Sequence, residues 1–131
     1  MDSDKVFHRD VSGTAMGVAS YLTVQTHGAD PGKRMLLRVL KVTIQRTGGT
    51  ATVYDPSLAS DPAGFDTYQE AWASDTTPPI ATVFQKDFVA DGLVMLSDTL
   101  GNIYLKPGWD AGADNACTAR VFIEKLRIIG A

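Results

Sequence analysis

RMLLRVLKVTIQRTGGTATVYD, residues 34–55, is the stretch that decides the fold. It consists of two runs of apolar and β-branched residues that meet at Gly48 and Gly49. A two-residue glycine loop is typical of a type I′ turn, because both central residues of that turn need a positive φ. The pattern therefore predicts a β-hairpin in which Ile44 faces Val53, with one apolar face and one face rich in hydroxyl groups.

Two of the expected strands change the phase of their apolar residues part of the way along. In the first half of the hairpin, the apolar positions move from odd to even numbers near Val39. In the last strand, residues 116–129, they move from odd to even near Glu124 and Lys125. An extra residue in one strand shifts the phase in this way, so the sequence predicts a β-bulge or bend at each place.

Further strands are expected wherever short apolar runs lie between turn-forming residues. Their expected ranges are 15–26, 80–89, 93–96 and 103–105. The long segment 56–79 is rich in Pro, Ser and Asp, and Thr67 and Glu70 in it have the spacing of a helix capping box. We therefore expect a short helix from about Tyr68 to Ala73 within this loop.

Together these elements predict an all-β protein. About seven or eight strands of unequal connection length favour an antiparallel β-sandwich, wound as a jelly roll, with one short helix in the long loop 56–79. Residues 14–131 are expected to form this single domain. Residues 1–13 follow neither the helix nor the strand period, and we expect them to form an arm that is disordered or lies along a neighbouring surface.

Composition excludes some classes of function and favours none. The chain has 131 residues and a formal net charge of −3, so it offers no support for nucleic-acid binding, which usually appears as a basic patch. Its N-terminus does not have the pattern of a signal peptide, and no apolar run is long enough for a membrane span. A single cysteine excludes an intramolecular disulfide.

No constellation of residues predicts a catalytic or metal site. His8 and His27 lack the close His or Cys neighbours of a zinc site, and the loop 110–115 lacks the alternating acidic ligands of a calcium loop. Cys117 begins an apolar strand, which favours a buried structural thiol over a nucleophile. Glu70 and Glu124 do not form a glycosidase-like pair. We therefore expect no enzymatic activity, no cofactor and no bound metal.

The order of these pieces resembles a family of phage proteins. The pieces are VxIxxxGGTxTVYD, GLVMLSDTLGN, IYLKPGW and AxVFIxKL, within residues 36–129. Together they are similar to the small jelly-roll decoration, or cement, proteins of tailed bacteriophage capsids. That resemblance implies a virion structural protein that binds the major capsid protein on the outer capsid surface, often as a trimer, after assembly in the host cytoplasm.

A decoration protein of this kind needs contact surfaces, and two stretches are candidates for them. One is the N-terminal arm, which would reach a neighbouring subunit or the capsid floor, and the other is the aromatic part of the long loop. The candidate contact residues are Phe7, Arg9, Val11, Phe65, Tyr68 and Trp72. The three aromatic residues of the loop fit a place at the end of the sheet core better than a contact surface.

Other functions stay open at this point. A glycan-binding jelly roll would use Tyr68, Trp72 and Trp109 as an aromatic platform, and a phage tail or fibre protein would share the same fold. A cupin-like enzyme would need a cluster of histidines and carboxylates on its strands, and the sequence shows none.

Overall fold

The computed structural model describes residues 6–26, 32–51, 53–54, 56–61, 70–71, 75–76, 83–88 and 92–130. Within these ranges every regular element is a β-strand, and none is a helix that could span a membrane. The strands form two sheets and one short ribbon.

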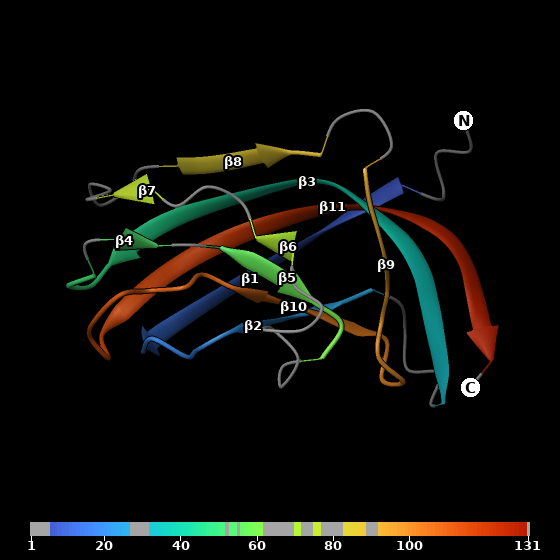
Figure 1. The fold of residues 1–131 in the computed structure, drawn as a ribbon, viewed down its shortest axis with the longest axis horizontal. Coiled ribbons are helices and arrows are strands. Elements are labelled where there is room, and N and C mark those ends of the chain that lie inside the picture. Colours follow the sequence, from blue (N-terminus) through green and yellow to red (C-terminus); the bar gives the residue numbers. More distant parts are fainter. Residues whose placement is uncertain are drawn as a thin grey trace.

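The larger sheet has five strands and is built around the two longest ones (Figure 1). Its strands are β1 (Val6–Met16), β3 (Lys33–Gly48), β8 (Val83–Asp87), β9 (Leu93–Leu96) and β11 (Asn115–Gly130). The order is β1-β11-β3-β8, and β9 pairs with β3 further along the same edge as β8. Every pairing is antiparallel.

The smaller sheet has four strands in the order β2-β10-β5-β6. They are β2 (Leu22–Gln25), β5 (Ser57–Ala59), β6 (Glu70–Ala71) and β10 (Asn102–Lys106). A separate two-stranded ribbon joins β4 (Val53–Tyr54) to β7 (Asp75–Thr76).

This strand order is that of a jelly roll. In the larger sheet the first strand lies beside the last, and the last lies beside β3. The chain then alternates between the sheets, since β2, β5 and β10 belong to the smaller one. A sandwich with such long connections is wound as Greek keys, which confirms the predicted fold class.

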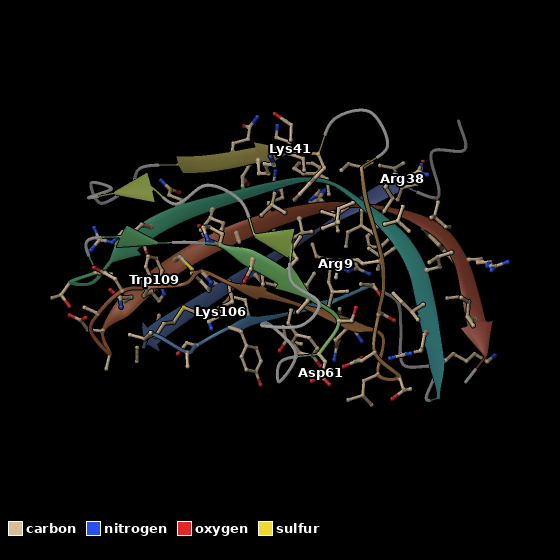
Figure 2. The ribbon with its side chains drawn as sticks, in the orientation of Figure 1. Arg9, Arg38, Lys41, Asp61, Lys106 and Trp109 are labelled. Atoms are coloured by element: carbon tan, nitrogen blue, oxygen red, sulfur yellow. The ribbon has the colours of Figure 1, made fainter. Side chains whose placement is uncertain are left out.

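The core fills the space between the two sheets. It takes alternate residues from each long strand, for example Met35, Leu37 and Val39 on β3, and Val121 and Ile123 on β11. Such alternation is what a sheet with one buried face requires. The largest fully buried side chain is Trp109, which lies at the end of the sandwich nearest β4 (Figure 2).

Both predicted phase changes are confirmed as bulges between β3 and β11. The pairing of Phe122 with Lys41 is followed by that of Ile123 with Val39, so Leu40 is the extra residue. A second shift lies between Lys125 and Arg127. Each bulge keeps the apolar side chains directed at the core while the strand bends. Beyond them β3 and β11 curve together, at the side of the molecule away from Trp109 (Figure 1).

The predicted hairpin is wrong. β3 ends at Gly48, and of the two glycines only Gly49 has a positive φ, 114°, so no type I′ turn forms. Ile44 pairs with Ala119 on one side and Phe84 on the other, not with Val53, which pairs with Thr76. The apolar alternation fixed which face of β3 is buried, but long-range pairing chose its neighbours.

The expectation for the N-terminal arm is wrong where the structure describes it. Residues 6–13 belong to β1, and their pairing with β11 has no register shift before Gly13. The expected strand 15–26 is divided, because β1 ends at Met16 and β2 begins at Leu22. An edge strand next to a partner as long as β11 gains its backbone hydrogen bonds from that partner, whatever its own weak period.

The expected helix is wrong at the two residues of it that are described, Glu70 and Ala71, which form β6 beside β5. The rest of it, residues 68–69 and 72–73, lies outside the described residues. The segment 56–79, expected as a loop, contributes β5, β6 and β7. Backbone pairing with β5 outweighs a capping motif, which contributes only about 1 kcal/mol.

Candidate functional site

The three aromatic contact candidates of the long loop, Phe65, Tyr68 and Trp72, lie outside the described residues. The other three candidates, Phe7, Arg9 and Val11, all belong to β1. The structure therefore tests only the placement of the β1 residues.

On β1, the contact candidates point toward the smaller sheet. Phe7 and Val11 are half-buried and pack against the core. Arg9 is exposed, donates from Nε to the carbonyl oxygen of Gln25 at 2.8 Å, and lies 4.8 Å above the ring of Phe7. Arg9 thus ties the edge of one sheet to the edge of the other. A role of these residues in contacting a partner stays a prediction.

The opposite face of the larger sheet is polar, and we call it the polar sheet face. Cross-strand pairing aligns its side chains in rows that run over β1, β11, β3 and β8. Its residues are His8, Asp10, Ser12, Lys41, Thr43, Gln45, Gln85, Asp87, Thr118, Arg120 and Phe122. Thr43 and Gln45 lie on the hydroxyl-rich face that the sequence predicted for residues 34–55, and the structure confirms that this face points away from the core.

An ion pair stands at the centre of this face. Arg120 donates to both carboxylate oxygens of Asp10, at 2.6 and 3.1 Å. The hydrogen bond from Arg120 lowers the pKa of the Asp10 carboxyl, so Asp10 is ionised at neutral pH. Beside this pair, the rings of His8 and Phe122 lie 5.7 Å apart and Lys41 lies 5.6 Å above Phe122. The charges of Asp10, Arg120 and Lys41 are therefore paired within the chain or lie against an aromatic ring, and Asp87 accepts a hydrogen bond from Gln85 at 2.9 Å.

A shallow, open depression of about 440 Å³ lies in the polar sheet face. It is lined by the Asp10–Arg120 pair and by small or uncharged side chains such as Ser12, Thr43 and Thr118. None of these hydroxyl groups has a histidine or cysteine beside it on the paired strands that could act as its base. The face suits contact with a polar surface better than chemistry on a small molecule.

Side chains elsewhere that could take part in chemistry are buried or bonded to other residues of the chain. Cys117 is buried, and desolvation raises the pKa of its thiol to about 11, which keeps it protonated and unreactive at neutral pH. The expectation of a buried structural thiol is thus confirmed. Glu124 accepts a hydrogen bond from Arg38 at 2.7 Å, and Figure 2 shows Arg38 where β3 begins to curve. The described residues contain no group of three or more His, Cys, Asp and Glu side chains that could hold a metal ion.

Two polar side chains organise loops by binding several backbone groups. Asp98 accepts hydrogen bonds from the backbone N–H groups of Leu100 and Asn102, both at 2.9 Å, and from the hydroxyl of Tyr104. Burial, followed by this bond to Asp98, raises the pKa of Tyr104 to about 12. The carboxylate thus fixes the turn between β9 and β10.

Asn115 does the same at the other end of the sandwich. It is fully buried, donates to the carbonyl oxygens of Met16 at 3.0 Å and Ala111 at 2.8 Å, and accepts from the N–H of Ala51 at 3.0 Å. The loop 110–115 was considered above as a calcium loop. In the structure, its Asn115 instead holds together the end of β1, the loop itself and the residues that follow β3. Its signal in the sequence was an Asn beside Gly and Asp, which ordinary turns also contain.

The aromatic platform expected for a glycan-binding protein is wrong at one of its three members. Trp109 is 1% exposed and belongs to the core, so it offers no ring face to a sugar. The other two members, Tyr68 and Trp72, lie outside the described residues.

No known protein family matches this chain, and no curated protein sequence does. Among solved structures, it is similar to VP1 of Trichodysplasia spinulosa-associated polyomavirus, solved in complex with sialylated glycooligomers. The TM-score is 0.54 at 8% identity, over 98% of this chain and 96% of that one. The structure of tomato aspermy virus is similar with a TM-score of 0.41 at 10% identity, over 94% of this chain and 79% of that one. A Bacillus endospore appendage protein also has a TM-score of 0.41 at 10% identity, over 94% of this chain and 90% of that one.

Of these three likenesses, the one to VP1 has a TM-score above 0.5, and at 8% identity the argument from it concerns the fold alone. It agrees with the strand order derived above. The chain therefore has an antiparallel, jelly-roll-like β-sandwich, a fold that it shares with VP1.

Proposed function

We propose that this chain is a non-enzymatic structural protein of a virion, and that it decorates the outer surface of a tailed-bacteriophage capsid. The observation that carries the proposal is the strand order of the two sheets, which is that of a jelly roll and has its likeness in VP1. The resemblance of the sequence to decoration proteins adds the phage and the capsid surface.

The chemistry of the described surface favours this function. On the polar sheet face, Asp10 is paired with Arg120 and Lys41 is packed on Phe122, and the thiol of Cys117 is buried. A rigid domain of this kind can act by covering the seams between capsid subunits. Many copies on a symmetric lattice make weak single contacts collectively strong.

The proposed partner is the major capsid protein, and the proposed oligomer is a trimer, as the resemblance implies. A trimer would bring three identical domains together over a symmetric site of the capsid and bury surface that one domain leaves exposed. Assembly would take place in the host cytoplasm.

The decisive experiment is quantitative mass spectrometry of purified virions from cells that carry the gene. A decoration protein is expected in a copy number close to that of the major capsid protein. A few copies per virion would instead indicate a tail or fibre protein, and absence from the virion would refute a structural role there.

A second experiment tests whether the chain stabilises the capsid. Heads purified from a phage that lacks the gene are expected to open at a lower temperature than wild-type heads, and addition of the purified chain is expected to restore their stability. Binding that is saturable at one ratio to the capsid protein supports the proposal. If the heads do not bind the added chain, the proposal is contradicted.

A further inference from the structure

The free edge of β1 is the most extended unpaired edge in the described part of the chain. β1 is an 11-residue strand that pairs with β11 on one side, and no described strand pairs with its other side. The pairing with β11 is continuous from Val6 to Gly13, so this part of β1 is regular. A long regular edge offers its backbone N–H and C=O groups to another strand, and natural proteins usually cover such an edge.

Neighbouring features indicate that this side of the sandwich is covered in an assembly. β2 is the edge of the smaller sheet and lies on the same side, joined to β1 by the bond between Arg9 and Gln25. A depression of about 440 Å³ lies between the two edges, with Gly13 and Tyr21 in its wall. Val18 and Tyr21, in the turn from β1 to β2, are 52% and 44% exposed. Large apolar side chains beside a free edge suit a contact with protein.

The side chains of β1 are complementary to a second copy of themselves. If two β1 strands pair antiparallel about a two-fold axis at Arg9, His8 of each copy faces Asp10 of the other. On the opposite face, Phe7 faces Val11. The polar pair then continues the polar sheet face, and the apolar pair continues the half-buried side of β1.

Two neighbouring registers of the same pairing are worse. An axis at Asp10 places the two Asp10 carboxylates opposite each other, and an axis at His8 brings the two His8 rings together. Like charges directly across a strand pair are destabilising, whereas opposite charges and apolar pairs stabilise it. The preferred axis also places the two Arg9 residues opposite each other, but each guanidinium is held by Gln25 of its own chain and by the ring of its own Phe7, so neither charge is left unbound between the strands.

We propose that two copies of this chain associate through antiparallel pairing of their β1 strands about a two-fold axis at Arg9. The contact joins two five-stranded sheets into one continuous sheet. It does not depend on the virion role, since it follows from the edge and its side chains. In a capsid lattice of trimers, the same contact would link neighbouring trimers in pairs.

A cysteine at the axis tests the register directly. Cys117 is the only cysteine and is buried, so the background of cross-linking is low. In Arg9→Cys, the two introduced thiols would lie opposite each other with Cβ atoms about 5 Å apart, close enough for a disulfide after a small adjustment. Mild oxidation is expected to give a covalent dimer on a non-reducing gel.

The matched control is Thr118→Cys, an exposed position on the central strand β11. This variant is expected to stay monomeric on the same gel, because β1 and β3 separate it from any partner strand. Equal dimer formation by both variants, or none by either, would overturn the proposal. Urea unfolding of both variants checks that they are folded.

Charge reversal provides a test without cysteines. His8→Asp places a carboxylate opposite Asp10 in both halves of the contact, which is expected to raise the dissociation constant about tenfold. Gln85→Asp adds the same charge on β8, on the far side of the sheet, and is expected to leave it unchanged. In light scattering, the wild-type chain should form a dimer or a pair of trimers. A monomer would overturn the β1 contact, as would an isolated trimer, which would still agree with the proposed decoration function.

Discussion

The side-chain amide of Asn115 donates a hydrogen bond of 3.0 Å to the carbonyl oxygen of Met16, a residue 99 positions earlier in the chain. The same amide group binds Ala111 and Ala51. One buried side chain therefore closes the end of the sandwich where the first strand, the third strand and the last strand meet.

Removal of this side chain is expected to be costly. Asn115→Ala would leave three backbone groups in a buried place without their partner, and we expect a loss of about 3 kcal/mol in the free energy of unfolding. Urea unfolding followed by circular dichroism measures it. Asp114→Ala, which removes only an exposed bond to Thr50, is the control and should cost less than about 1 kcal/mol. Equal losses in the two variants would contradict the role of Asn115.

The two adjacent glycines are expected to differ sharply. At Gly49, φ is 114° and an added Cβ would collide with Asn115, so Gly49→Ala should destabilise the protein by at least about 2 kcal/mol. At Gly48, an added Cβ would meet only the Cβ of Ala116 at 4.0 Å. Gly48→Ala should therefore be neutral or stabilise by up to about 1 kcal/mol. A type I′ turn would predict instead that both changes are harmful.

Cys117 is expected to make the protein less stable in alkali. Burial raises the pKa of this thiol from its ordinary 9.0 to about 11, so above pH 9 the unfolded chain loses a proton that the folded chain keeps. The contribution of this thiol to the free energy of unfolding is fully present below pH 9. It decreases between pH 9 and 11, by about 2 kcal/mol at pH 11. Unfolding curves over this range measure the fall.

The matched variant for this measurement is Cys117→Ala. It loses the titrating group, so its stability should fall less steeply over the same pH range. The fall that remains would come from other groups, among them Tyr104, whose pKa is raised to about 12. If both proteins lost stability in parallel between pH 9 and 11, the contribution of Cys117 would be refuted.

The ion pair between Arg38 and Glu124 is expected to stabilise the bend of the larger sheet. The side chains of Arg38 and Glu124 are 33% and 19% exposed, so they are screened less than surface charges. A double-mutant cycle with Arg38→Ala and Glu124→Ala should give a coupling free energy of about 1 kcal/mol. The same cycle on the exposed pair of Asp10 and Arg120 should give a smaller value that falls as salt is added. A larger coupling in the exposed pair would contradict this expectation.

The sequence alone predicted the buried face of a strand better than it predicted which strands lie beside it. The alternation of Met35, Leu37 and Val39 identified the buried face of β3, and its phase change located the bulge at Leu40. The same pattern misassigned the partner of Ile44, because a half-buried strand has the same alternation whichever strand lies beside it. The candidate contacts Phe7 and Val11 were assigned to an arm for a different reason: residues 1–13 have no clear period of their own, and only the pairing with β11 makes them a strand.

By itself, the sequence determined the all-β class, the buried faces of the long strands and the buried thiol of Cys117, since these follow from local periodicity and composition. The tertiary structure decided that Gly48 and Gly49 end β3 without turning it back, and that β11 lies between β1 and β3. It also decided that Asn115 is a structural junction. These features depend on residues far apart in the chain, whose pairing is set by the competition of all strands for neighbours.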